Sequence, residues 1–213
     1  YLHTPGRLFE DGTQVIHSFA LSAFQNAQLT SGEQNWLFWL FFIAFAVKMP
    51  VFPFHTWQPD TYDQSPTSVT MVLSAVMVKM GLFGIIRWLI PVFPDAVAKF
   101  SDIVIILSVT GIIYASCIAM VQDNIKKLVA YSSIAHIGLM CAALFAANQV
   151  SIQGVMMQMF NHGINIIGMW IVADLLEKQT GVKEISKLSG VANKAPVLTI
   201  LFVIIALANI ALP

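Results

Sequence analysis

Four ionisable side chains lie near the centres of long apolar stretches of the sequence: Lys48, Lys79, His136 and His162. Inserting a lysine at the centre of a membrane-spanning helix costs about 2.5–3.5 kcal/mol, and only a lysine near a helix end can extend its ammonium group to the membrane surface. These positions therefore predict side chains that face the interior of a helix bundle, where the lysines would contact each other through water, or a carboxylate. Because histidine exchanges protons near neutral pH, such a row would form a proton relay.

The stretch FFIAFAVKMPVFPFHTWQPD (residues 41–60) places Lys48 where an apolar run meets two prolines. Pro50 and Pro53 remove backbone donors and clash with the preceding turn, so we expect the helix to break just after the lysine. A charge beside broken backbone is tolerated at membrane depth when both face protein or a water-filled cavity. An ion path is therefore expected here. The alternative is a structural lysine that binds carbonyls freed at the break, which suits Lys48 better than Lys79.

Each of the two central histidines shares a helical face with polar side chains. These neighbours are Gln158 and Asn165 beside His162, and Ser132 and Ser133 beside His136. Such polar stripes can hold a file of water that links the two rings. A simple hydrogen bond to a neighbouring helix is the alternative for either histidine.

His55 follows the predicted break, in PFHTWQPD. It could feed protons into the path from the inner surface, or it could cap the short second half of the broken helix, and the sequence supports both interpretations equally. Asp60, directly after Pro59, is expected to start a turn or cap a helix.

The composition is that of an integral membrane protein. Of the 213 residues, 57% are hydrophobic and only 10% are charged, and the mean hydropathy is +0.76. Soluble domains carry roughly 25% charged residues. The formal net charge is zero, so the sequence lacks the excess of basic residues that is typical of a nucleic-acid-binding protein.

Six apolar segments each approach or exceed the roughly 20 residues that cross a bilayer. The predicted spans are 36–62, 67–92, 101–122, 125–147, 152–176 and 196–213. Residues 36–213 are therefore predicted to form one domain, an all-α polytopic transmembrane helix bundle with a discontinuous helix near Lys48. Residues 1–35 are polar and rich in turn residues, and we expect an extracytoplasmic loop or hairpin there. Because the chain starts without Met and stops inside an apolar run, we expect a fragment of a longer protein.

Basic residues between the spans predict the orientation. One set of loops carries six lysines, whereas the opposite set carries Arg7 and Lys99. The six are Lys126, Lys127, Lys178, Lys183, Lys187 and Lys194. The six-lysine side is therefore predicted to be cytoplasmic, together with the loop around residues 55–66.

Signatures of redox chemistry are lacking from the sequence. It has no Gly-rich phosphate loop, no CxxC pair for an iron–sulfur cluster and no pair of histidines at a spacing typical of haem ligands. Cys117 and Cys141 fall inside apolar runs, so we interpret both as small core residues. We expect neither a cofactor nor a metal ion on this chain.

The segment AVKMPVFPFHTWQPD, followed by SPTSVTMVLSAVMVKMGLFGIIRW, resembles the antiporter-like membrane subunits of complex I, the proton-pumping NADH:quinone oxidoreductase. The stretches DNIKKLVAYSSIAHIGLM and QMFNHGINIIGMWI fit the same family in order and spacing. The resemblance covers roughly residues 36–213, and the long first motif is highly specific.

The resemblance implies a role for each candidate residue. The broken-helix lysine of the family falls on Lys48, its central channel lysine on Lys79, its two relay histidines on His136 and His162, and the histidine after the break on His55. The family fold has two inverted five-helix repeats, each with one discontinuous helix. A glutamate that pairs with the Lys48-type residue, and a charged residue in the second broken helix, are family elements that lie outside this sequence.

The resemblance further implies a subunit of a translocase in the bacterial inner membrane, which couples electron transfer in partner subunits to proton transport. NADH, flavin, iron–sulfur clusters and quinone are expected on partner subunits, with no redox chemistry on this chain. Expected partners are other membrane subunits of complex I, the lipid bilayer and protons. A redox-free cation/proton antiporter and a membrane-bound hydrogenase complex are the alternatives, because they carry similar subunits.

Overall fold

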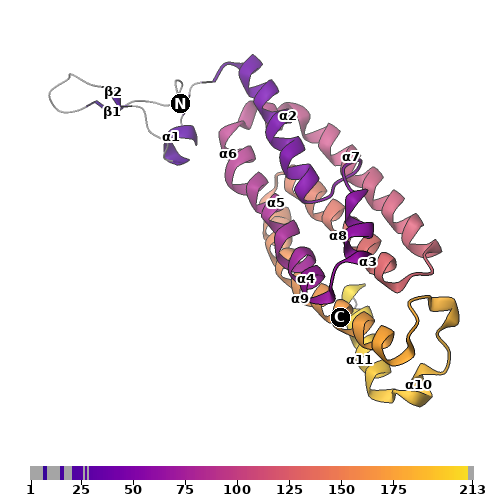
Figure 1. Cartoon of the computed structure of the whole chain (residues 1–213). Coiled ribbons are helices and arrows are strands. Elements are labelled where there is room, and N and C mark those ends of the chain that lie inside the picture. The colour runs from indigo at the N-terminus through magenta and orange to yellow at the C-terminus, as the bar shows by residue number, and fades with distance from the viewer. Residues whose placement is uncertain (1–6, 9–14, 17–20, 26, 28, 211–213) are drawn as a thin grey trace.

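The computed structural model describes residues 7–8, 15–16, 21–25, 27 and 29–210. The main body is an elongated bundle of helices (Figure 1). Near the N-terminus, strand β1 (Arg7–Leu8) pairs antiparallel with β2 (Val15–Ile16), and the short helix α1 (Leu21–Gln25) follows. The extracytoplasmic position expected for residues 1–35 stays a prediction.

Among the described residues, four helices are long and apolar enough to cross a membrane, by length and composition. The first is continuous over Thr67–Val92 and comprises α4 (Thr67–Val72), η1 (Leu73–Met77), α5 (Val78–Gly84), η2 (Ile85–Leu89) and α6 (Ile90–Val92). The others are α7 (Pro94–Val121), α8 (Ile125–Phe145) and α9 (Gln149–Thr180). A shorter apolar helix, α11, runs over Pro196–Asn209. The predicted fold class, an all-α transmembrane bundle, is confirmed.

The boundaries differ from the apolar runs where capping residues extend a helix. Helix α2 (Ser31–Lys48) begins five residues before the predicted span because Thr30 and Glu33 form a capping box at its N-terminus. Helix α7 starts at Pro94 instead of residue 101, since proline is well suited to the first turn of a helix. In both cases residues at the N-terminus extend the helix beyond the apolar run.

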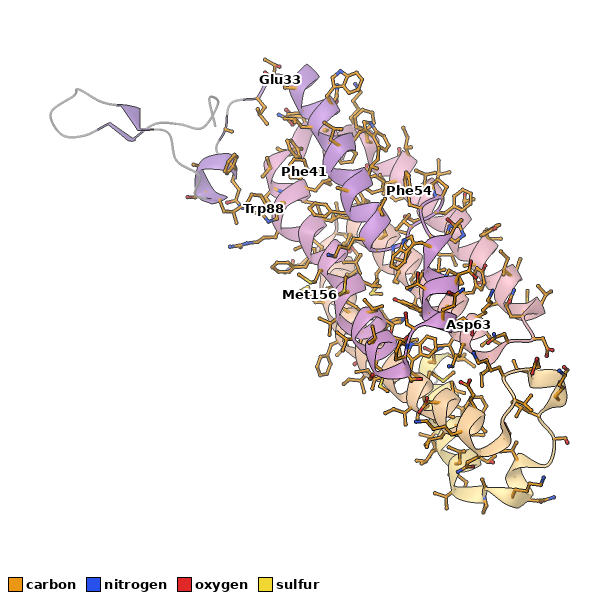
Figure 2. The ribbon with its side chains drawn as sticks, in the orientation of Figure 1. Glu33, Phe41, Phe54, Asp63, Trp88 and Met156 are labelled. Atoms are coloured by element: carbon orange, nitrogen blue, oxygen red, sulfur yellow. The ribbon has the colours of Figure 1, made fainter. Side chains whose placement is uncertain are left out.

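The break after Lys48 is confirmed. Helix α2 ends at Lys48, the backbone between Pro50 and Thr56 is not helical, and the half-helix α3 covers Trp57–Gln64. Glu33 at the start of α2 and Asp63 near the end of α3 mark the two ends of this discontinuous element (Figure 2).

Helix α2 packs very closely against α5. A Cβ atom on Gly81 would lie 2.7 Å from the Cβ of Met49 and 3.0 Å from the backbone oxygen of Phe45, so only glycine fits at this crossing. Buried side chains from both helices, including Phe42, Ala46 and Leu82, belong to the largest core cluster. This contact places the end of α2 beside the turn that precedes Lys79.

Two turns of the Thr67–Val92 helix, η1 and η2, are π-helical. A π turn takes one extra residue and rotates the residues that follow by roughly 100° relative to a regular α-helix. Such turns are rare and often lie at functional sites. The η1 turn ends two residues before Lys79 and packs against α9.

At one end of the bundle, ion pairs join α8 and the loop after α9 to α3, and α8 to α9. Lys127 pairs with Asp60, Lys183 with Asp63, and Lys126 with Glu177 at 2.6 Å. The 3₁₀ turn η3 (Ile185–Lys187) and helix α10 (Val191–Lys194) lie at this end, opposite α1 (Figure 1). The loop around residues 55–66 therefore shares a side with the six lysines, as the orientation argument expects.

Candidate functional site

Lys79 and His162 form a buried contact at the centre of the bundle. The Nζ atom of Lys79 lies 2.8 Å from Nδ1 of His162, and the ammonium group also donates to the backbone oxygen of Ser74 at 2.7 Å. Only 7% of Lys79 and 2% of His162 are exposed. The described part of the chain places no carboxylate within ion-pair distance of Lys79, so these polar atoms are what stabilise its charge.

The π turn explains why Ser74 takes part. Its carbonyl lies in the widened η1 turn, five residues before Lys79, and its hydroxyl donates to the backbone oxygen of Thr70 at 2.7 Å. On its other side, Lys79 lines an apolar pocket of about 360 Å³ with Met80, Phe83 and Met156. The ammonium is thus directed toward His162.

This geometry permits direct proton transfer. When lysine carries the proton, Nδ1 of His162 accepts the hydrogen bond; when the proton moves to Nδ1, the ring donates to a neutral amine. A nitrogen–nitrogen distance of 2.8 Å is within hydrogen-bond range, so neither side chain has to move.

His136, on α8, packs against the ring of His162. The two ring centroids are 5.3 Å apart with an interplanar angle of 60°. His136 is half-buried, whereas His162 is almost fully buried. The structure thus brings Lys79, His162 and His136 together, with His162 as the direct partner of the lysine.

The polar stripe predicted around His162 lines a pocket of about 400 Å³ between α9 and the end of α11. Its walls include Gln158, His162 and Asn165 from α9, with Asn209 from α11. Asn209 donates to the hydroxyl of Ser132 on α8 at 3.1 Å. This pocket is the space in which the predicted water file would lie.

Ser74 and Asn209 were not identified from the sequence. Ser74 acts through its backbone oxygen, for which a residue type gives no signal. Asn209 is the polar residue of the apolar run IIALANIALP, and its isolated amide could have indicated a polar contact inside the bundle.

The sequence predicts that Lys48 faces the bundle interior. In the structure its side chain is exposed on the described surface. It lines a pocket of about 290 Å³ with Trp57 of α3 and with three residues around the η1 turn: Leu73, Met77 and Val78. Within the described residues its ammonium has neither an ion-pair nor a hydrogen-bond partner. Because α2 is apolar nearly all round, its sequence could not fix which way the lysine points.

His55 is buried in an aromatic environment. It is 3% exposed and packs against Phe52 and Tyr114, with ring centroids 5.6 and 5.2 Å away. Helix α3 has Thr56 at its N-cap position and no side-chain capping bond. The capping role considered for His55 is therefore wrong, and its role in proton uptake stays a prediction.

No group of three or more potential metal ligands of the His, Cys, Asp and Glu types occurs within the described residues. Both cysteines are free, Cys141 buried and Cys117 exposed.

Comparison with known proteins identifies related membrane subunits. The family described as NADH:quinone oxidoreductase/Mrp antiporter, TM, matches residues 10–213. NADH-quinone oxidoreductase subunit M of Rickettsia prowazekii is 42% identical over 200 residues, which cover 93% of this chain and 41% of that protein.

Solved structures of membrane complexes contain chains with a similar fold. A chain of respiratory complex I from Thermus thermophilus superposes with a TM-score of 0.86 and 28% identity, covering 92% of this chain and 42% of the other. A chain of the archaeal membrane-bound sulfane sulfur reductase superposes with a TM-score of 0.84 and 26% identity, covering 91% and 40%. The chain thus spans about two fifths of the length of these relatives.

Proposed function

We propose that this chain, which belongs to the NADH:quinone oxidoreductase/Mrp antiporter transmembrane family, forms the central proton relay of a membrane subunit of NADH:quinone oxidoreductase. The chain is a multi-pass protein of the bacterial inner membrane. The buried contact between Lys79 and His162 is the observation that carries the proposal. It is a pair of proton-exchanging groups within hydrogen-bond distance, at the centre of a transmembrane bundle.

In this proposal Lys79 holds the proton between transfer steps. Two acceptors, the backbone oxygen of Ser74 and Nδ1 of His162, stabilise the charged amine in an otherwise apolar surrounding. His162 accepts the proton and passes it to water in the polar pocket or toward His136. His55, at the break, would take up protons from the inner surface.

Lys48 controls the proton affinity of Lys79 electrostatically. Its pocket is bounded by Leu73, Met77 and Val78, which flank Ser74 and Lys79 in the sequence. A carboxylate from the longer subunit would pair with Lys48, and quinone reduction in partner subunits would shift that pairing. Because like charges repel, a less neutralised Lys48 favours loss of the proton from Lys79.

The expected partners follow from the names of the relatives. NADH-quinone oxidoreductase subunit M is the name carried by the Rickettsia protein, so we propose that this chain works beside other membrane subunits of complex I. NADH, flavin, iron–sulfur clusters and quinone would be bound by those partners, and this chain would transport protons without redox chemistry of its own.

A native gel of detergent-solubilised source membranes, stained for NADH oxidation, tests the assignment. We expect peptides of this chain in the NADH-oxidising band. Their presence only in a band without that activity would contradict the proposal and favour a redox-free cation/proton antiporter or another respiratory complex with similar subunits. The relay residues would then draw on a different energy source.

A further inference from the structure

The C-terminal end of α2 is left with backbone oxygens that a regular helix would satisfy. Pro50 has no N–H to give to Ala46, four residues earlier. The N–H of Val51 takes that acceptor instead, at 3.1 Å, while the N–H of Met49 binds Phe45 at 2.8 Å. In a regular helix the N–H of Val51 would bind the backbone oxygen of Val47. Because it binds Ala46 instead, the Val47 oxygen, next to Lys48, needs another donor.

The indole of Trp57 supplies that partner. Its Nε1–H donates to the backbone oxygen of Val47 at 3.0 Å. Trp57 is the first residue of α3, so this single hydrogen bond joins the two halves of the discontinuous helix across the break. The bond reaches the residue directly before Lys48.

The Trp57 ring is itself held by aromatic contacts with the centre of the bundle. It packs edge-on against Tyr62, at 6.4 Å and 88°, and Tyr62 packs edge-on against Trp170, at 5.7 Å and 85°. Tyr62 and Trp170 are fully buried, and Trp170 lies two turns after His162 on α9. Trp57 also lines the same pocket as Lys48.

We propose that Trp57 is a positioning residue that fixes Lys48 relative to the helix carrying Lys79, through the bond from its indole to the Val47 carbonyl. The inference rests on the proposed function, because it assumes that the charge of Lys48 acts on Lys79. Loss of the N–H releases the last turn of α2, and Lys48 then spends time away from the pocket beside Leu73 and Val78.

The test uses the intact complex reconstituted in liposomes, with protons translocated per NADH measured as a function of pH. Trp57→Phe keeps the aromatic contacts and removes the donor. We expect translocation to fall about two- to fivefold, the scale of one lost hydrogen bond, with a shifted pH profile. Trp57→His keeps a ring N–H and should recover part of the loss. Trp36→Phe, a change at an exposed tryptophan of α2, should have no effect.

A double-mutant cycle with Lys48 separates positioning from a general packing role. If Trp57 acts through Lys48, translocation in W57F/K48A equals that in K48A, and W57F no longer shifts the pH profile in the K48A background. An effect of W57F in the K48A background as large as in wild type would overturn the inference, as would a W57F variant that behaves like W36F. If K48A itself translocates normally, the proposed role of Lys48 fails first.

Discussion

Nζ of Lys79 and Nδ1 of His162 lie 2.8 Å apart although the two residues are 83 positions apart in the chain. Two structural features create this contact. The π turn η1 sets the direction of Lys79, and α9 packs directly against that turn. Both partners are buried, so the contact is held by the fold and not by flexible surface side chains.

The histidines should differ in importance because only His162 touches Lys79. His162→Ala is expected to lower the rate of proton translocation by about 100-fold, the scale of one positioned proton-transfer group. His136→Ala should lower it less, since Lys79 is hydrogen-bonded to His162 and His136 packs against that ring. Translocation coupled to NADH oxidation in membrane vesicles measures both. A larger loss in His136→Ala would show that the order of the two rings is wrong.

Gly81 should tolerate no side chain. The Cβ of Gly81→Ala would lie 2.7 Å from the Cβ of Met49, and overpacking of this kind lowers the free energy of unfolding by about 2 kcal/mol. Gly154→Ala is the matched control, because a Cβ there meets nothing within 4 Å. Titration of the purified subunit with SDS gives the two values. Equal stabilities would mean that α2 and α5 are not so closely packed.

The ion pair between Lys126 and Glu177 should contribute more to the free energy of unfolding than an exposed pair does. Glu177→Gln leaves the buried ammonium of Lys126 without its 2.6 Å partner, which should cost about 3 kcal/mol in unfolding free energy. Glu184→Gln breaks an exposed pair with Lys187 and should cost under about 1 kcal/mol. The same SDS titration compares the two, and a larger cost at Glu184 would refute the argument.

Asp123 should stabilise the turn around Ser186, in η3, in a pH-dependent way. Hydrogen bonds from the backbone and side chain of Ser186, both 2.7 Å, hold the pKa of Asp123 below its usual range. A lowered pKa in the folded state contributes stability above the usual pKa, and this is lost as the pH falls through the folded value. The protection factors of the amides around Ser186, which compare each exchange rate with the intrinsic rate at the same pH, should therefore fall on acidification.

The variant Asp123→Asn isolates this effect. It should show low protection factors around Ser186 already at neutral pH and little further decrease in acid. Asp102→Asn is the control, because Asp102 is exposed and makes no hydrogen bond or ion pair among the described residues. Acid-dependent exchange that persists unchanged in Asp123→Asn would assign the pH response to another group.

The break after Lys48 could be predicted because proline acts locally: Pro50 removes a donor whatever the surrounding fold. The spans could be predicted for a similar reason, since roughly 20 apolar residues suit a bilayer in any arrangement. His162 and the polar side chains of its face likewise follow from helical spacing alone, and they do line one pocket.

The direction of Lys48 and the contact between Lys79 and His162 could not be predicted in the same way. The η1 turn has the sequence LSAVM, with neither proline nor glycine to mark it, and it changes the direction of every side chain that follows. Which helix then meets Lys79 depends on tertiary packing between segments far apart in the sequence. The hydrogen bond from Trp57 to the Val47 carbonyl likewise depends on the path of the backbone through the break, which the sequence does not specify.

The most direct test of the relay is the number of protons translocated per NADH by the intact complex carrying Lys79→Ala. Lys99→Ala, which removes an exposed lysine, serves as the control for changes in charge alone. We predict that Lys79→Ala translocates only a small fraction of the protons moved by the control, because His162 loses its proton donor. Unchanged translocation per NADH in Lys79→Ala would contradict the account and exclude Lys79 as the centre of the relay.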